Sequence, residues 1–299
     1  MFDALLTVIL PVVLVALVGV ALGRTFSLDQ DSIGKVSLHG LTPMLAFASL
    51  LRTSVSLGDG LGLALAYLGS SAIVGFLAWV TSRGTSRRTQ RAVVACTVLG
   101  NNGNFGLPIA LLALGQAGLD QAVLIFVFSL VIMFTVGPAL LGPGSALTSG
   151  LVTIAKLPVA WAMVAALACR MTGWTPPVAV MRAVDLLAAA AVPVVLLSLG
   201  IQLATSGRIH LNRAVLTASV LRVIVLPLAS LGVGLLIGMR GLPLYGLVLA
   251  QVMPTAVNAF MIAREYGTET ETVASVVALT TFVSIPAIAF VVSLIPTVA

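Results

Sequence analysis

The sequence predicts an all-α polytopic membrane protein with ten transmembrane helices, arranged as a five-plus-five inverted repeat. Of its 299 residues, 60% are hydrophobic and 8% are charged, whereas soluble domains carry about 25% charged residues. Apolar runs recur along the whole chain, most of them near the roughly 20 residues that cross a bilayer. The prolines recur at a near-constant spacing between the two halves. No polar stretch is long enough to build a soluble domain.

The apolar runs define ten predicted spans, most of them joined by short loops. They cover residues 4–23, 33–51, 60–82, 91–116, 120–141, 149–169, 182–204, 212–238, 243–266 and 272–295. The chain starts Met1-Phe2-Asp3, without basic residues before the apolar run, so we expect a retained helix and not a cleaved signal. The turn cluster Gly142-Pro143-Gly144-Ser145 divides the chain into a first repeat, 1–142, and a second, 143–299.

Four of the first five predicted helices carry a proline that has a partner five helices later. The pairs are Pro11 and Pro158, Pro43 and Pro193, Pro108 and Pro254, and Pro138 and Pro286, separated by 147, 150, 146 and 148 residues. A repeat of five helices is odd-numbered, so its second copy enters the membrane from the opposite side. Inverted repeats of this kind are common in transporters.

The distribution of Lys and Arg predicts the orientation. Loops after odd-numbered spans hold ten of these residues, and loops after even-numbered spans hold four. The ten are Arg24, Lys35, Arg83, Arg87, Arg88, Arg91, Lys156, Arg208, Arg213 and Arg264; the four are Arg52, Arg170, Arg182 and Arg240. The positive-inside rule puts the first set in the cytoplasm. We therefore expect a multi-pass protein of the cell membrane with both termini extracytoplasmic. The rule also accounts for the net charge of +6, so we expect no nucleic-acid partner.

The residues that usually carry catalysis or bind metals are sparse. Cys96 and Cys169 lie in apolar runs, and His39 and His210 are far apart and have no metal-ligand spacing. An intramembrane enzyme would need a nucleophile with a base, or clustered His and acids at depth. The sequence therefore predicts neither an enzyme nor a bound metal or cofactor.

The most informative stretch is Gly100-Asn101-Asn102-Gly103-Asn104-Phe105-Gly106-Leu107-Pro108. It lies inside a charge-free run of 28 residues, 92–119. Gly and Pro break helices, and unsatisfied polar backbone in lipid costs several kcal/mol per group. Such a segment is stable at membrane depth where it lines a cavity enclosed by protein or filled with water. Broken helices of this kind are where secondary transporters bind substrate. The alternative is a kinked packing helix whose glycines allow close contacts.

The repeat-related partner of this stretch is Gln251-Val252-Met253-Pro254-Thr255-Ala256-Val257-Asn258. Proline suits the first position of a helix, so each break can start a new half-helix at its proline. The N-terminal ends of two half-helices would then create an anion site. The candidate substrate-binding residues are Asn101, Asn102, Gly103, Asn104, Pro108, Pro254, Thr255 and Asn258. For each Asn, the alternative is that its amide caps backbone groups freed at the break.

Arg222 is the one ionisable residue well inside a predicted span, and it completes the candidate site. It could bind a substrate carboxylate through its bidentate fork, or bind backbone carbonyls. Asp185 falls in the first turn of its predicted helix, where a capping role is expected. Because no Asp or Glu occupies a mid-membrane position, a carboxylate proton relay is not expected. Coupling to H⁺ or Na⁺ stays open.

The motifs GNNGNFGLPIALLALG, at 100–115, and MPTAVNAFMIAREYG, at 253–267, resemble those of the auxin efflux carrier family, which includes PIN-type auxin transporters and bacterial organic-acid permeases. The resemblance covers the whole chain. It implies that helices 4 and 9 cross at Pro108 and Pro254, where the substrate binds. It also implies a homodimer and an elevator mechanism, with helices 1, 2, 6 and 7 as scaffold and helices 3–5 and 8–10 as the mobile transport domain.

The predicted function is therefore secondary transport of small organic anions, chiefly carboxylates, across the bilayer. One alternative is a sodium-coupled symporter of the bile-acid transporter type, in which carbonyls freed at the breaks hold Na⁺. A receptor or channel that does not act as a carrier is another. Flux assays would distinguish a carrier, which shows saturation and counterflow, from a receptor or a channel.

Overall fold

The computed structural model describes residues 5–53, 55, 57–142, 147–204 and 209–295. Within these ranges the chain is helical and has no strand, apart from an isolated bridge between Gly100 and Thr255. The elements are η1 (Leu5–Ile9), α2 (Leu10–Thr25), α3 (Gln30–Val36), η2 (Ser37–Leu41), α4 (Thr42–Arg52), α5 (Leu57–Thr81), α6 (Arg87–Val98), η3 (Asn102–Gly106), α7 (Leu107–Leu141), α8 (Leu147–Lys156), α9 (Pro158–Thr172), α10 (Val178–Ala204), α11 (Arg213–Val220), η4 (Leu221–Val225), α12 (Leu226–Leu236), α13 (Gly241–Gln251), α14 (Val257–Glu265) and α15 (Thr270–Leu294).

Six helical segments are long and apolar enough to cross a membrane, which confirms an all-helical membrane protein. They are Leu6–Thr25, Gly58–Thr81, Asn102–Leu141, Val178–Ala204, Arg213–Leu236 and Thr270–Leu294. The count of ten spans and the inverted repeat stay predictions. Residues 143–145 of the predicted central turn lie outside the described residues, as do Arg208 and the chain ends 1–4 and 296–299.

Each of the four π-helical turns, η1 to η4, ends two residues before a proline. The prolines are Pro11, Pro43, Pro108 and Pro227. A proline inside a helix removes one backbone donor, and its ring clashes with the carbonyl four residues earlier. A wider turn with i→i+5 bonds relieves both problems without ending the helix. The prolines therefore locally unwind several helices but do not break them.

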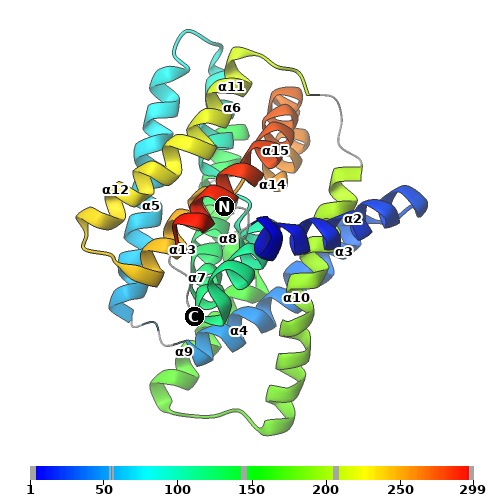
Figure 1. Ribbon diagram of the computed structural model, residues 1–299, viewed down its shortest axis with the longest axis vertical. Coiled ribbons are helices and arrows are strands. Elements are labelled where there is room, and N and C mark those ends of the chain that lie inside the picture. Colours follow the sequence, from blue (N-terminus) through cyan, green and yellow to red (C-terminus); the bar gives the residue numbers. More distant parts are fainter. Residues whose placement is uncertain (1–4, 54, 56, 143–146, 205–208, 296–299) are drawn as a thin grey trace.

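The helices pack in two groups that meet at α7 (Figure 1). One contains α2, α4, α9 and α10; the other contains α5, α6 and α11 to α15. The first group depends on backbone contact between α2 and α10. A Cβ on Gly19 would lie 2.2 Å from the Leu197 carbonyl oxygen, and one on Gly200 would lie 1.9 Å from that of Ala16. Small residues allow this approach in membranes. The division into a scaffold and a mobile transport domain stays a prediction.

The element α7 joins two helices that the sequence analysis separated near 116–120. Gly115 has φ 67° and ψ −163°, and the chain reverses there. Only glycine adopts this backbone readily. The short helix before Gly115 leads away from the motif at Gly100–Pro108, and the long helix after it returns.

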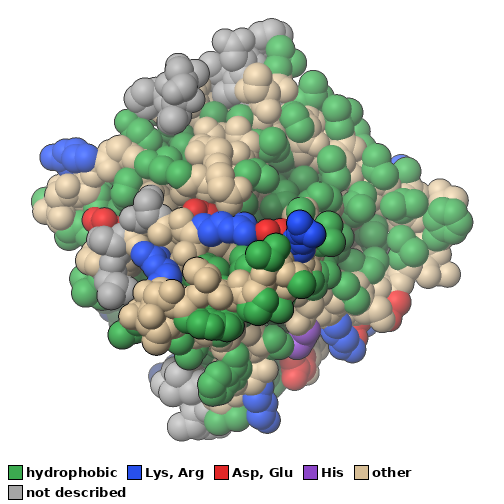
Figure 2. All heavy atoms as spheres, turned by 90° about the horizontal axis from the view of Figure 1, so that it is seen from below, with side chains coloured by type: hydrophobic (Ala, Val, Ile, Leu, Met, Phe, Trp, Pro, Cys, Tyr) green, Lys and Arg blue, Asp and Glu red, His purple; other side chains and the backbone are tan. Residues whose placement is uncertain are grey.

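Large apolar side chains cover much of the surface (Figure 2). Leu186, Leu236, Trp161 and Phe76 are each more than 60% exposed. Exposed apolar surface on this scale marks contact with lipid or with other protein. The charged side chains gather in a few places on the face that Figure 2 shows.

Candidate substrate site at the crossing of two interrupted helices

The two motifs found in the sequence meet in the structure at the gaps in their helices. The first gap lies between α6 and η3, and the second between α13 and α14. The backbone N–H of Asn101 donates to the Pro254 carbonyl at 2.9 Å, and that of Ala256 donates to the Leu99 carbonyl at 2.8 Å. This antiparallel pairing satisfies backbone groups that neither helix can satisfy alone.

The two prolines do not play equivalent parts in this crossing. Pro254 belongs to the paired segment, but Pro108 follows η3 near the start of α7. The prediction that helices 4 and 9 cross at both prolines is therefore wrong for the first helix, which opens at residues 99–101. Pro108 widens the helix into the turn η3 and leaves the opening to the glycine and asparagines before it.

Thr255 is fully buried and fastens the second gap to its surroundings. Its hydroxyl donates to the Cys96 carbonyl at 2.7 Å, and its backbone N–H donates to the Thr280 hydroxyl at 3.1 Å. The Cys96 carbonyl belongs to the last turn of α6, where carbonyls lack intrahelical partners. Thr255 therefore has a structural role at the crossing.

Arg222 is fully buried in η4 and reaches both gaps. Its Nε donates to the Met253 carbonyl at 2.8 Å, and its Nη1 donates to the Thr97 carbonyl at 3.1 Å. Carbonyl binding, one of the two roles considered for Arg222, is present, while Nη2 has no partner among the described residues and its contact with a substrate carboxylate stays a prediction. A Cβ on Gly100 would lie 2.1 Å from Nη2, so the guanidinium fits there because residue 100 is glycine.

The helix ends at the crossing therefore differ in partial charge and in how that charge is balanced. The C-terminal ends of α6 and α13 carry partial negative charge, and the Arg222 guanidinium lies against carbonyls at both of them. The N-terminal ends of η3–α7 and of α14 carry partial positive charge and have no acidic residue in their first turns. The arrangement favours an anion at the N-terminal ends.

The asparagines of the two motifs fall into two classes. Asn101 and Asn102 are buried, and the Asn102 amide donates to the Tyr67 hydroxyl at 2.9 Å. Asn104 is half-buried and Asn258 is exposed; neither side chain makes a hydrogen bond to another described residue. The side-chain amides of Asn104 and Asn258 therefore have no partner among the described residues, and the buried Oδ1 of Asn102 has none either.

Gly103, the remaining predicted residue, contributes space at the turn η3. A Cβ there would lie 2.8 Å from the Phe126 ring. The turn also packs against α10, so the crossing faces the first group of helices. A ligand bound at η3 would therefore contact both groups.

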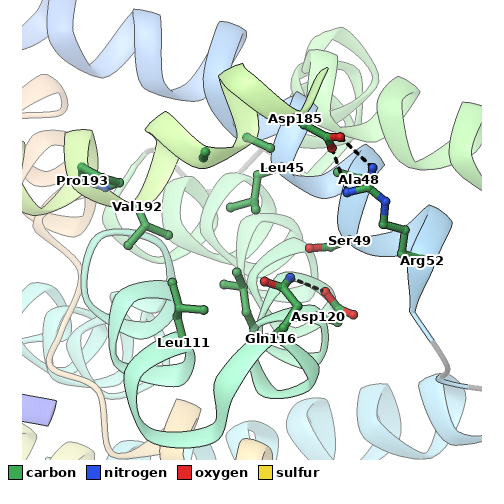
Figure 3. Close-up of a pocket in the computed structure, with 13 residues that line it drawn as sticks. Leu45, Ala48, Ser49, Arg52, Leu111, Gln116, Asp120, Asp185, Val192 and Pro193 are labelled. Carbon is green, nitrogen blue, oxygen red and sulfur yellow. Dashed lines mark hydrogen bonds and ion pairs between the residues drawn. The ribbon is translucent and has the colours of Figure 1, made fainter. Parts of the chain in front are cut away.

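A cavity of about 570 Å³ lies between α4, α7 and α10, and we call it the Arg52 cavity (Figure 3). Its charged or amide-bearing lining residues are Arg52, Asp185, Gln116 and Asp120. The sequence analysis gave no role to Arg52, Gln116 or Asp120. The signal was present, because Asp120 is the residue that ends the charge-free run 92–119.

The capping role expected for Asp185 is wrong. The helix α10 begins at Val178, directly after two prolines, so Asp185 lies two turns inside it. Its carboxylate pairs with the Arg52 guanidinium at 2.8 Å. The predicted span started too late because Arg182 was read as part of a loop.

Apolar helices that cross through two interrupted segments are typical of integral membrane transport proteins. The chain belongs to the membrane transport protein family, the auxin efflux carrier family, whose model matches residues 4–292. This confirms the resemblance seen in the two motifs.

Several curated relatives are similar over most of the chain. An uncharacterized transporter of Methanothermobacter thermautotrophicus is 27% identical over 287 residues, 93% of each chain. One of Escherichia coli is also 27% identical over 287 residues, which is 88% of this chain and 89% of the relative. A protein of Rhizobium meliloti named "Putative malonate transporter" is 32% identical over 200 residues, 62% of this chain and 61% of its own length. All three names describe transporters.

Proposed function

We propose that this protein is a secondary transporter of small organic anions, chiefly carboxylates, and that the crossing binds them. The observation that carries the proposal is the meeting of two half-helix N-terminal ends beside the accessible amides of Asn104 and Asn258. Such ends bind carboxylates through free N–H groups and the helix dipole. The name of the Rhizobium relative supports the same class of substrate.

A ligand screen tests this proposal on the purified protein. Malonate and other small carboxylates should raise the unfolding temperature, because a ligand that binds the folded state stabilises it by mass action. Malonamide, the neutral analogue, should not. In proteoliposomes, the carboxylate that binds should show saturable uptake and counterflow. Binding of malonamide as tightly as malonate would contradict an anion site.

We further propose that transport does not need Na⁺ at the crossing. In the sodium-coupled alternative, carbonyls freed at the breaks hold the cation. Here the Thr97 and Met253 carbonyls accept hydrogen bonds from Arg222, a cation of the protein itself. Uptake measured with Na⁺ replaced by choline should therefore be unchanged. A strict requirement for Na⁺ would favour the bile-acid transporter type of mechanism.

The proposed mechanism is an elevator in which α5 to α7 and α11 to α15 move against α2, α4, α9 and α10. The support is the packing in two groups and the family membership. Leu45 of α4 and Leu111 of α7 line the Arg52 cavity on the two sides of the boundary proposed for the elevator. Cysteines at these positions, in a background without Cys96 and Cys169, should cross-link with a short bifunctional reagent. Flux should stop while carboxylate binding persists; full flux through the cross-linked protein would contradict the mechanism.

The orientation and the homodimer belong to the same proposal. We expect the segment Arg83 to Arg91 in the cytoplasm, so a cysteine at Thr85 in whole cells should be protected from an impermeant thiol reagent. Labelling of intact cells at Thr85 would reverse the topology. Cross-linking between single cysteines on the exposed face of α9, for example at Trp161, tests whether the scaffold group forms the dimer contact.

A further inference from the structure

The Arg52 cavity lies between the two helix groups and differs in character from one end to the other. Leu111, Val192 and Pro193 make one end apolar, and Arg52 and Asp185 lie at the other (Figure 3). The helix α10 lines the cavity and also packs against the turn η3, so the cavity and the crossing both lie along this helix. A small molecule in the cavity would therefore be next to the proposed substrate site.

Arg52 is the one cation among the cavity's lining residues, and its partner can be exchanged. The Arg52 and Asp185 side chains are 54% and 44% exposed, so water competes for both. Ion pairs this open contribute little to stability. A carboxylate that entered the cavity could replace Asp185 on the Arg52 guanidinium, whose planar fork binds carboxylates in two-point fashion.

Asp120 faces the same cavity from α7 and, unlike Arg52 and Asp185, it is buried. It is 8% exposed, and Gln116 donates an amide hydrogen bond to its carboxylate at 3.1 Å. Arg52 of α4 and Asp185 of α10 are the other charged side chains that line the cavity. The helix α13, which also packs on α7, has no Asp, Glu, Lys, Arg or His, and α5 has only Asp59, which is outside the lining.

The charges of the cavity set a condition for binding an anion. With Asp120 and Asp185 ionised and Arg52 protonated, the formal charge of the lining is −1. A second carboxylate on Arg52 would bring three negative charges around one positive charge in a partly dehydrated space. One proton taken up with a single carboxylate keeps the formal charge of the lining at −1. Asp120 is the better acceptor for it, because Asp185 has Arg52 as partner and more access to water.

We propose that the Arg52 cavity is a second carboxylate site, in which Arg52 binds the anion and Asp120 takes up one proton with it. The substrate carboxylate replaces the Asp185 carboxylate on the guanidinium, and H⁺ from solvent adds to a carboxylate oxygen of Asp120. On the predicted topology this end of the cavity opens outside the cytoplasm, so the site would load an anion and a proton together. The proposal rests on the proposed function and adds H⁺ as the coupling ion.

Proton uptake on binding tests the proposal on the full chain in nanodiscs. Malonate is titrated calorimetrically at about pH 7.5, where free carboxylic acids are ionised, in buffers that differ in ionisation enthalpy. At saturation the parent protein should take up about one proton per chain, from the Arg52 cavity and not from the crossing. Asp120→Asn should bind malonate without proton uptake, because its amide is neutral at every pH. Asp31→Asn, an exposed acid in α3 outside the cavity, is the matched control and should behave like the parent.

Substitutions of Arg52 test separately whether its guanidinium binds the anion. Arg52→Gln should weaken malonate binding roughly 10-fold or more, as expected for a lost hydrogen bond between charged groups. Arg52→Lys should lose less, and Arg182→Gln, an exposed cation of α10 outside the lining, should change nothing. If Arg52→Gln does not fold, Arg52→Lys and Asp120→Asn still decide the question.

Each contrary outcome has a definite meaning. Proton uptake that persists in Asp120→Asn, or binding of malonate without any proton uptake by the parent, would overturn this inference and leave the proposed function standing. Binding of propylamine that Asp120→Asn abolishes would show a cation site and overturn it as well. Failure of the parent to bind malonate and propionate under all conditions would overturn both the inference and the proposed function.

Discussion

The two gaps at the crossing look alike in the sequence but are stabilised in different ways. The first gap is short and leads at once into the turn η3, so Asn102 and Asn104 lie on helical backbone while Asn101 lies in the gap. The second gap spans residues 252–256, and its polar residue Thr255 is fully buried and bonded to α6 and α15. The first gap thus presents amides, and the second mainly connects backbones.

The difference shows how a membrane protein can open two helices and still pair backbone groups across the two gaps. Each gap supplies half of the antiparallel pairing, and Arg222 binds a carbonyl at each of them. Residues that complete this network are needed for the fold. Residues that stay outside it, such as Asn104 and Asn258, are available for the substrate. The comparison therefore separates polar residues that are bonded within the protein from those that we propose for substrate binding.

Removing the cation that serves both gaps should have the largest effect. Arg222→Gln leaves the Thr97 and Met253 carbonyls without their donors in a fully buried site. Breaking a buried charged contact costs about 3–5 kcal/mol, so thermal unfolding in detergent should occur at a markedly lower temperature. Arg264→Gln, an exposed arginine of α14, should change stability by less than about 0.5 kcal/mol. Equal stability of both variants would remove Arg222 from the structural network.

A smaller loss is expected at the second gap. Thr255→Val keeps the side-chain shape and removes the hydroxyl bonded to the Cys96 carbonyl. Leaving a buried acceptor unpaired costs about 1–3 kcal/mol. Thr281→Val is the matched control, because that hydroxyl bonds only within its own helix α15. If both variants unfold at the same temperature, the hydroxyl of Thr255 does not hold the two gaps together.

At the first gap, substitution of Asn102 should mainly lower stability, and substitution of Asn104 should mainly lower substrate affinity. Asn102→Ala removes the donor to Tyr67 and should cost about 1 kcal/mol of stability, with substrate affinity lowered only indirectly. Asn104→Ala should leave the unfolding temperature unchanged and weaken carboxylate binding. Paired measurements of unfolding temperature and malonate affinity in the two variants check this. The reverse pattern would make Asn104 the structural residue.

Much of the fold could be predicted from the sequence because lipid imposes strong constraints. Apolar runs had to be helices, and the cluster at Gly100–Pro108 had to lie where protein satisfies its backbone. The segments that cross were therefore predicted correctly. The start of α10 was misplaced, because charges locate helix ends only approximately, whereas the reversal at Gly115 lies next to residue 116, the predicted end of the fourth span.

The candidate site could be predicted less completely. Composition marks which residues are polar, but partners decide their roles. Nothing in the sequence says that Thr255 bonds to the carbonyl of Cys96, or that Asp185 pairs with Arg52, 133 positions away. Long-range contacts of this kind depend on how the two helix groups pack. The Arg52 cavity was missed for the same reason.

The central claim is that the accessible amides at the crossing bind the substrate, and Asn258 tests it most directly. Asn258 is exposed near the N-terminal end of α14 and makes no hydrogen bond to another described residue, so Asn258→Ala should fold normally. Malonate affinity, measured by calorimetry on the purified protein, should fall roughly 10-fold or more, since a hydrogen bond to a charged ligand contributes about 1.5–3 kcal/mol. Met261→Ala, a truncation on the same exposed face of α14, should bind malonate like the parent. A folded Asn258→Ala protein with the parent's affinity would contradict the claim and leave the crossing a structural feature alone.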